Sequence, residues 1–280
     1  MKIFEETPQK IIDAAARAIE CAKTLIITAG AGMGVDSGLP DFRGDQGFWN
    51  AYPLYERLGL RFTELAAPRY FMQDPEFAWG FYGHRANLYR DAVPHVGFSI
   101  LKSWHETRGL ASFVITSNVD GQFHKAGFDP DNIVEVHGSI HHMQCLEPCC
   151  LEIWQNDQSL EIDLATMRSL TIPTCNGCGS AARPNVLMFA DWSWIPSRTD
   201  KQQERLDRFL RECPQPMVIV ELGAGRAVPT IRRTSECLAK KYGAVLVRIN
   251  PREPDVPHPH ISIANGAAAT LIRINDALQG

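Results

Sequence analysis

The stretch that decides the fold is GAGMGVDSGLPDFRG, which occupies residues 30–44 of a 280-residue chain. A β-branched, apolar run precedes it at 24–28 and predicts a buried strand of a parallel sheet. A strand that ends in a glycine-rich turn is typical of α/β proteins that bind a pyrophosphate, because glycine has no Cβ to hold the ligand away. The glycines alone also fit an ordinary strand–loop junction. The loop that continues to Arg43 has no helical or strand periodicity. Ordering it costs conformational entropy, and it buries little apolar surface to offset that cost, so we expect it to bind a ligand.

The composition excludes several classes of protein. With 45% hydrophobic and 21% charged residues, the chain has an ordinary globular composition. Its net charge of -4 and its lack of a long basic run argue against binding to nucleic acid. No apolar run approaches the roughly 20 residues that a membrane span needs, and the first residues lack the apolar core of a signal peptide. We therefore expect a cytoplasmic protein that binds neither nucleic acid nor membrane; its oligomeric state stays open.

Strand-like apolar runs alternate with helical patterns along the rest of the chain. The runs lie at 113–116, 133–136, 217–222, 244–249 and 261–263. Repeated strand–helix units predict an α/β fold with a doubly wound parallel sheet and right-handed crossovers. Residues 45–95 are aromatic-rich and irregular, and their helical fragments predict an insertion that covers the first loop.

Polar side chains follow two of the expected strands. Asn118 and Asp120 come after the strand at 113–116, and His137 comes after the strand at 133–136. Open α/β sheets bind ligands at the carboxyl ends of their strands, so we expect these side chains in a cleft. For Asn118 and Asp120 the alternative is an Asx turn that caps a helix. An unperturbed imidazole titrates at about pH 6.5, which suits His137 to act as a general base near neutrality.

Five of the eight cysteines cluster in a short segment. They are Cys145, Cys149, Cys150, Cys175 and Cys178. Two short-spaced thiolate pairs carried by turns predict a tetrahedral structural zinc site, because four sulfurs close the coordination shell. Four of the five can be ligands, and we favour Cys149 over Cys150 because a proline presets the turn into it. The remaining three cysteines lie in helical patterns and are expected in the core; they are Cys21, Cys213 and Cys237.

Taken together, these motifs resemble those of the sirtuins, a family of NAD-dependent protein deacylases. The resemblance rests on the Gly30 turn, SGLPDFR at 37–43, the segment 116–120, His137-Gly138, the paired cysteines, RPNV at 183–186, the Gly223 turn and Ile249-Asn250. It covers roughly residues 20–278 and implies a Rossmann-like doubly wound domain made of residues 1–44, 96–141 and 183–280. The implied architecture also includes a helical insertion at 45–95 and a small zinc-binding module at 142–182.

The resemblance further implies that NAD binds between these parts. The implied cofactor-binding residues are Gly30, Ala31, Gly32, Asp41, Phe42 and Arg43 of the first loop, Ser117, Asn118, Asp120 and His137 after the strands, and Gly223, Ala224, Gly225 and Asn250 around the adenosine. Asn118, Asp120 and His137 are the implied catalytic set, with His137 as the general base. In the family reaction the acyl-lysine oxygen of a protein substrate attacks C1′ of the nicotinamide ribose and nicotinamide leaves. The base then promotes attack by the 2′-hydroxyl, which yields free lysine and O-acyl-ADP-ribose.

The chain departs from the family pattern at several positions. Gly34 stands where the family usually has serine, and Ser117 stands where it usually has glutamine. The family's Gly-Thr-Ser turn is Gly-Ala-Gly at 223–225, and its Phe-Gly-Glu is Phe-Ala-Asp at 189–191. Loss of a long amide near the ribose keeps mono-ADP-ribosyl transfer or NAD hydrolysis open as an alternative activity. A non-catalytic NAD-binding or ADP-ribose-binding module is the third alternative.

Tyr82 and Arg85 are three residues apart on an expected helix, so they share one helix face. An arginine that extends past a packed tyrosine is the plain structural interpretation. The pair also matches the motif of the desuccinylase, demalonylase and deglutarylase branch of the family, where an arginine and a tyrosine hydroxyl hold the carboxylate of the acyl group. A guanidinium and a phenol suit a carboxylate in an apolar tunnel. The sequence leaves acidic-acyl preference and simple deacetylation open.

Overall fold

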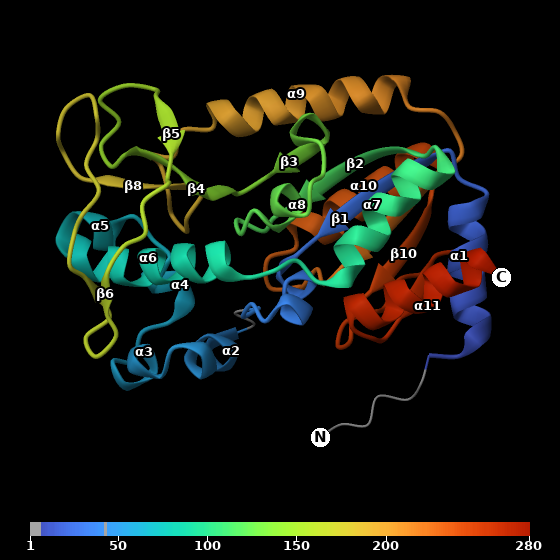
Figure 1. The fold of residues 1–280 in the computed structure, drawn as a ribbon, viewed down its shortest axis with the longest axis horizontal. Helices are drawn as coiled ribbons and strands as arrows, with labels where there is room; N and C mark the ends of the chain where they lie inside the picture. The colour runs from blue at the N-terminus through green and yellow to red at the C-terminus, as the bar shows by residue number, and fades with distance from the viewer. Residues whose placement is uncertain (1–6, 42–43) are drawn as a thin grey trace.

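The larger lobe of the protein is built around a six-stranded parallel sheet (Figure 1). The structure is a computed structural model and describes residues 7–41 and 44–280. The strands are β1 (Thr24–Ala29), β2 (Ala111–Thr116), β3 (Ile133–Glu135), β9 (Met217–Leu222), β10 (Val245–Ile249) and β11 (Ile261–Ile263). Their order across the sheet is β11-β10-β9-β1-β2-β3. Numbered within this sheet alone, that is the 3-2-1-4-5-6 order of Rossmann folds, and the predicted doubly wound parallel sheet is confirmed.

Alternating side chains of the strands build two cores, one on each face of the sheet. Leu25 and Ile27 point to the face covered by α1 (Gln9–Glu20), α7 (Val96–Arg108) and α11 (Ala267–Gln279). Ile26 points to the opposite face, which is covered by α9 (Ser197–Glu212) and α10 (Thr230–Tyr242). The β1 residues are buried throughout, which explains why the strand has an uninterrupted apolar sequence.

A smaller lobe stands beside the carboxyl ends of the sheet (Figure 1). Its helices are α2 (Gly44–Ala51), α3 (Pro53–Arg57), α4 (Phe62–Leu65), α5 (Arg69–Gln73) and α6 (Pro75–Asp91). Its three-stranded antiparallel sheet places β4 (Gly138–Cys145) between β5 (Ile153–Gln155) and β8 (Ala182–Val186), and β6 (Ile162–Asp163) and β7 (Arg168–Ser169) form a hairpin. The short helices elsewhere are η1 (Ala31–Met33), η2 (Val35–Ser37), α8 (Gln122–Lys125) and η3 (Pro130–Asn132). A third core, rich in aromatic side chains, joins the helices of this lobe to β4 and β8.

The helix α6 packs directly on the backbone of the β6–β7 hairpin. A Cβ atom added at Gly80 would lie 1.8 Å from the carbonyl oxygen of Met167. Only glycine permits this approach, so the position of α6 depends on one residue without a side chain.

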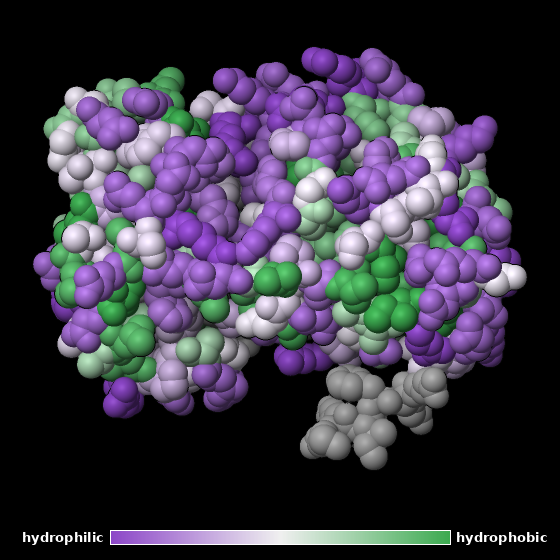
Figure 2. All heavy atoms as spheres, viewed as in Figure 1, coloured by the Kyte–Doolittle hydropathy of each residue, from purple (hydrophilic) through white to green (hydrophobic). Residues whose placement is uncertain are grey.

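None of the described helices has both the length and the apolar character that a membrane span requires. Hydrophilic side chains cover most of the face shown in Figure 2, with smaller hydrophobic areas between them.

Candidate functional site

A cavity of about 610 Å³ opens where the carboxyl ends of β1, β2 and β9 meet. In the sheet order this is the point where successive connections turn in opposite directions, which is where open α/β sheets bind ligands. The cavity brings together most of the residues that the sequence analysis assigned to cofactor, catalysis and substrate: Gly30, Ala31, Asp41, Tyr82, Arg85, Ser117, Asn118, Asp120, His137, Gly223, Ala224 and Gly225. Gly32 and Asn250 do not line it. Phe42 and Arg43 lie outside the described residues.

The glycines of the two loops have a structural reason that the sequence did not show. A Cβ at Gly30 would lie 2.8 Å from the Cα of Ala224, and a Cβ at Gly223 would lie 2.4 Å from the Cα of Gly32. The Gly32 amide also donates to the Gly223 carbonyl at 3.1 Å. These glycines therefore let the two loops touch each other, and Gly30 and Gly223 also line the cavity, so close approach of a pyrophosphate to their backbone stays a prediction.

Asn250 lies beneath the second loop instead of facing the cavity. It is fully buried, and its Nδ2 donates to the Ala224 carbonyl at 2.8 Å. Its Oδ1 accepts from the amides of Arg252 and Glu253 at 3.0 Å each. Asn250 thus sets the shape of the loop that carries Ala224.

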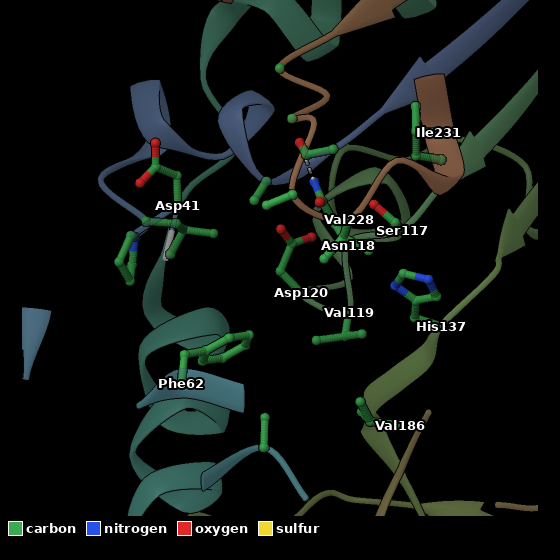
Figure 3. Close-up of a pocket in the computed structure, with 18 of the residues that line it drawn as sticks. Asp41, Phe62, Ser117, Asn118, Val119, Asp120, His137, Val186, Val228 and Ile231 are labelled. Carbon is green, nitrogen blue, oxygen red and sulfur yellow. Dashed lines mark hydrogen bonds between the residues drawn. The ribbon is translucent and has the colours of Figure 1, made fainter. Parts of the chain in front are cut away.

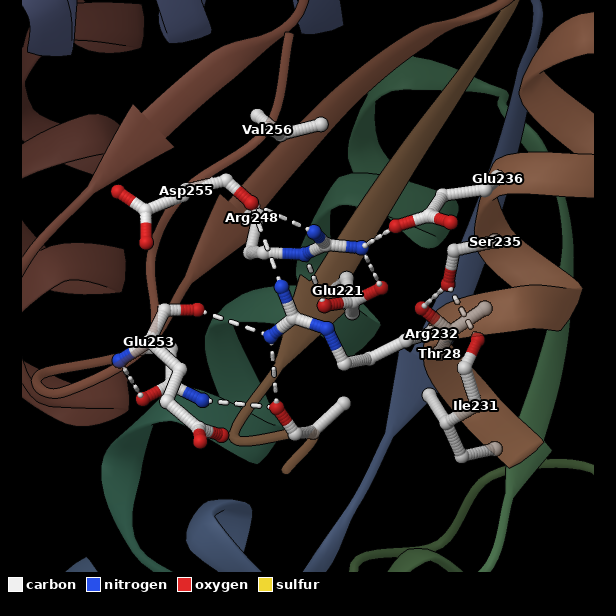
Figure 4. A network of polar contacts seen from close by, with 12 residues as sticks. Thr28, Glu221, Ile231, Arg232, Ser235, Glu236, Arg248, Glu253, Asp255 and Val256 are labelled. Atoms are coloured by element: carbon white, nitrogen blue, oxygen red, sulfur yellow. Dashed lines mark hydrogen bonds and ion pairs between the residues drawn. The ribbon is translucent and has the colours of Figure 1, made fainter. Parts of the chain in front are cut away.

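A buried network of charges holds the same end of the cavity (Figure 4). Arg248 and Glu221 are register partners on β10 and β9, and Arg248 Nε donates to Glu221 Oε1 at 2.5 Å. Arg248 also bonds Glu236 of α10 at 2.8 Å. Arg232 donates to the carbonyls of Ala224 at 3.3 Å and Glu253 at 2.9 Å. Each buried charge therefore has a partner, as burial of charge requires.

Asn118 and His95 hold the first loop in place. Asn118 Nδ2 donates to the Gly30 carbonyl at 3.1 Å. His95 Nε2 lies 2.9 Å from the Met33 carbonyl oxygen, and the His95 amide donates to Ser37 Oγ at 3.0 Å. This role of His95 was not predicted from the sequence, although its place just before α7 was a usable signal.

Asp120 serves both roles that the sequence left open. Its Oδ1 accepts from the Gln122 amide at 2.9 Å, as in an Asx turn, and its side chain also lines the cavity. Burial raises the pKa of Asp120 from 3.8 to about 6, and the charge of Glu135 acts in the same direction. The carboxylate is thus available in ionised form near neutral pH.

His137 lies across the cavity from Asp120 (Figure 3). Burial lowers the pKa of His137 below its usual value of 6.5, although a hydrogen bond to the backbone of Ser117 opposes this shift. Its Nε2 lies 3.5 Å from the hydroxyl of Thr230, the first residue of α10. A neutral imidazole in a cavity can take up a proton, which is the property that a general base needs.

The wall opposite the glycine loops comes from the smaller lobe. Tyr82 and Arg85 reach the cavity from α6, and Tyr89 and Phe62, which the sequence analysis did not single out, reach it beside them. Tyr89 comes four residues after Arg85, so the sequence already indicated that the two share one face of the helix.

The segment after β8 joins the two lobes along the edge of the cavity. The Leu187 amide donates to the His137 carbonyl, and the Phe189 amide donates to the Ala66 carbonyl, at 2.9 Å each. Arg183 and Asp191 form a fully buried ion pair that shapes this turn. The Phe-Ala-Asp departure therefore retains a carboxylate in a structural role.

The cysteine cluster fits a zinc ion. The sulfurs of Cys145, Cys149, Cys175 and Cys178 all lie within 4.8 Å of one another, with Cys145–Cys178 at 3.7 Å and Cys149–Cys175 at 3.6 Å. Four thiolates at about 2.3 Å from a tetrahedral zinc are about 3.8 Å apart. The cluster contains Cys149, which the sequence analysis favoured, and none of its members lines the cavity. Its chemistry is that of a structural site.

The expectation that the other cysteines belong to the core was wrong. Cys21 and Cys237 are exposed, and Cys213 is half-buried. Cys21 and Cys213 cap the carboxyl ends of α1 and α9, where the helical pattern gives way to a turn.

Comparisons with known proteins agree on one family. The model of the Sir2 family matches residues 30–225. The chain is 32% identical over 254 residues to NAD-dependent protein deacylase 1 of Archaeoglobus fulgidus, a match that covers 89% of this chain and 91% of that protein. It is 30% identical over 261 residues to an NAD-dependent protein deacylase of Thermus thermophilus, with 91% of each chain covered. Among solved structures, the crystal structure of a Sir2 homolog–NAD complex is similar with a TM-score of 0.72 and 26% identity, and the match covers 95% of this chain and 93% of that one.

Proposed function

The chain belongs to the Sir2 family, and from this premise we propose that it is an NAD-dependent deacylase that acts on acylated lysine side chains of proteins. The observation that carries the proposal is the single cavity in which both glycine loops, Asn118, Asp120 and His137 converge. The relatives named above favour this activity over mono-ADP-ribosyl transfer or NAD hydrolysis. A thiolate zinc site needs reduced cysteines, which supports action in the cytoplasm.

The donor set suits NAD. Backbone groups at Gly30–Ala31 and 223–225, the Asn118 amide and the Asp120 carboxylate offer the donors and acceptors that phosphates, a carboxamide and ribose hydroxyls require. When bound, NAD would supply the electrophilic C1′ of its nicotinamide ribose as acceptor of the acyl oxygen. Asp120 orients the polar part of the cofactor. Neutral His137 takes a proton at a ring nitrogen. The apolar side chains of Val186, Met188 and Phe62 exclude water around them.

We further propose that the cavity prefers acyl groups that end in a carboxylate, such as succinyl and malonyl groups. Arg85 is only 6% exposed and Tyr82 only 1%, yet both line the cavity. A buried cation is costly unless an anion or other polar partner compensates it. Arg85 already donates to the Tyr89 hydroxyl, and a carboxylate on the acyl group would add a charge-assisted hydrogen bond that an acetyl group cannot make.

An assay with acylated peptide and NAD tests the activity. We expect nicotinamide and free lysine in equal amounts; consumption of NAD without peptide turnover would contradict deacylation. His137→Ala should lower kcat by about 100-fold or more, because a positioned base contributes on that scale. His258→Ala removes an exposed histidine of a loop and serves as the matched control, which should retain full activity.

Arg85→Met tests the acyl preference. It removes the charge and keeps an unbranched apolar stem, so desuccinylation should fall by about 100-fold while deacetylation changes little. Equal losses on succinyl and acetyl peptides would refute the carboxylate role and leave deacylation itself untouched.

A further inference from the structure

The guanidinium of Arg85 is enclosed by aromatic rings. Its Cζ lies 5.1 Å from the ring centre of Phe81, 5.6 Å from Tyr82, 5.3 Å from Tyr89 and 6.0 Å from Phe62. Such contacts stabilise a cation in a dry site, but ring faces are broad and do not fix the rotation of a planar group. Orientation must come from directional hydrogen bonds.

Tyr89 provides two such bonds. Its hydroxyl oxygen accepts from Arg85 Nε at 3.1 Å and from Nη2 at 2.9 Å. The two residues are four apart on α6, so one rigid helix sets their separation. Because two donors of one plane meet a single oxygen, the plane of the guanidinium is fixed relative to the helix.

A carboxylate also lines the cavity that Arg85 lines. Asp120 lines the cavity, and its charge acts on both Arg85 and Tyr89. A mobile arginine would turn toward this fixed anion and lose the geometry that a substrate carboxylate needs for two parallel hydrogen bonds.

From these contacts we infer that Tyr89 is a positioning residue that sets the preference for acyl groups ending in a carboxylate, by holding Arg85 in the orientation that binds the carboxylate. The inference rests on the proposed function, in which Arg85 receives that carboxylate. Tyr89 acts through Arg85, so its effect belongs to binding of the acidic acyl group and not to the chemical step. The usual Tyr-x-x-Arg pair is thereby extended in this chain to Tyr-x-x-Arg-x-x-x-Tyr.

The test compares Tyr89→Phe with wild type on succinyl-lysine and acetyl-lysine peptides. We expect KM for the succinyl peptide to rise about tenfold with kcat unchanged, since a hydrogen bond to a charged group is lost. Both constants for the acetyl peptide should stay within about twofold. A merely structural role would change kcat or affect both peptides alike, and either result overturns the inference.

Tyr55→Phe is the matched control. Tyr55 lies in the same aromatic cluster, and its hydroxyl is buried without a hydrogen-bond partner in the described structure. Its removal should leave the succinyl KM unchanged; a rise equal to that of Tyr89→Phe also overturns the inference.

Arg85→Met separates the two proposals. If that change is selective for succinyl and Tyr89→Phe has no effect, the inference fails and the proposed function stands. If Arg85→Met is not selective, the carboxylate role falls and the inference falls with it.

Discussion

Asp120 is a buried carboxylate whose burial shifts its pKa toward the protonated form. Burial raises its pKa from 3.8 to about 6, so the folded chain favours the protonated form. A group with a raised pKa contributes stability that is fully present below pH 3.8 and is lost as the pH rises through about 6. Near neutral pH the ionised side chain therefore lowers the free energy of unfolding of the protein.

The first prediction is that Asp120→Asn stabilises the protein at neutral and alkaline pH while it lowers activity. The amide keeps an oxygen that can accept from the Gln122 amide. The free energy of unfolding should rise by about 3 kcal/mol at pH ~8 and by about half as much at pH ~5. Urea denaturation at both pH values measures this. Asp157→Asn, which changes an exposed carboxylate, should show no such gain, and a gain independent of pH would contradict the account.

Gly34 stands where the family usually has serine, and its structural setting is the clearest among the positions that differ from the family pattern. Its backbone is helical, with φ -78° and ψ -10°, so a side chain is allowed there. An added Cβ would lie 3.2 Å from Leu39 Cδ1 and 3.6 Å from Asp120 Oδ2. A serine would fit after a small shift of Leu39, and its hydroxyl would reach the carboxylate.

The second prediction follows for Gly34→Ser. A hydroxyl that donates to ionised Asp120 favours the charged form and lowers its pKa. The acidic limb of kcat/KM for NAD should then move to lower pH, with a stability loss within about 1 kcal/mol. Gly34→Ala supplies the Cβ without the donor and should leave the limb in place. Equal shifts in the two variants would show that the hydroxyl is not responsible.

At the scale of elements, α6 links the cavity to the β6–β7 hairpin through two glycines of different environments. At Gly80 an added Cβ would meet the Met167 carbonyl at 1.8 Å, which is backbone and cannot yield. At Gly83 the nearest atoms are the side-chain ends of Ile162 and Leu160, at 3.0 Å each. These ends can rotate away.

The third prediction contrasts Gly80→Ala with Gly83→Ala. Helix propensity alone favours alanine by about 1 kcal/mol at both positions. Because the clash at Gly80 forces α6 off the hairpin, Gly80→Ala should lower the free energy of unfolding by about 2 kcal/mol or more. Gly83→Ala should change it by less than about 1 kcal/mol. Thermal denaturation of both variants decides, and similar midpoints would refute the steric explanation.

Local patterns made the sheet and the position of its cavity predictable. β1 and β9 are apolar runs that are buried on both faces, and polar residues at strand ends fall on one edge once the strands are parallel. The pairing of β4 with β8 joins segments about forty residues apart, and no local pattern encodes it. From the sequence, Gly80 appears only as a residue of low helix propensity, because the contact that requires glycine there is made with the distant β6–β7 hairpin. The ligand and substrate roles of the cavity residues remain predictions.

For the whole molecule, the cavity depends on two lobes that are stabilised in different ways. The larger lobe has two apolar cores around its sheet. The smaller lobe contributes Tyr82, Arg85 and Met188 to the cavity and has short strands at β5, β6 and β7. A bound metal can hold such short strands together. The four-cysteine cluster at the open end of β4 is placed to supply that stabilisation.

The last prediction is that zinc maintains the smaller lobe and, through it, the acyl end of the cavity. Metal analysis should find one zinc per chain, and Cys175→Ser should abolish it, because three thiolates bind far more weakly than four. Loss of several kcal/mol of binding free energy should lower the thermal midpoint by about 10 °C or more. Cys150→Ser is the matched control: its sulfur lies 3.8 Å from that of Cys149 but outside the cluster, so zinc content and midpoint should be unchanged. Full zinc content in Cys175→Ser would show that the cluster is not the metal site.

Because α6 packs on the hairpin between the two cysteine pairs, desuccinylation should be lost at lower chelator concentration than binding of NAD to the larger lobe.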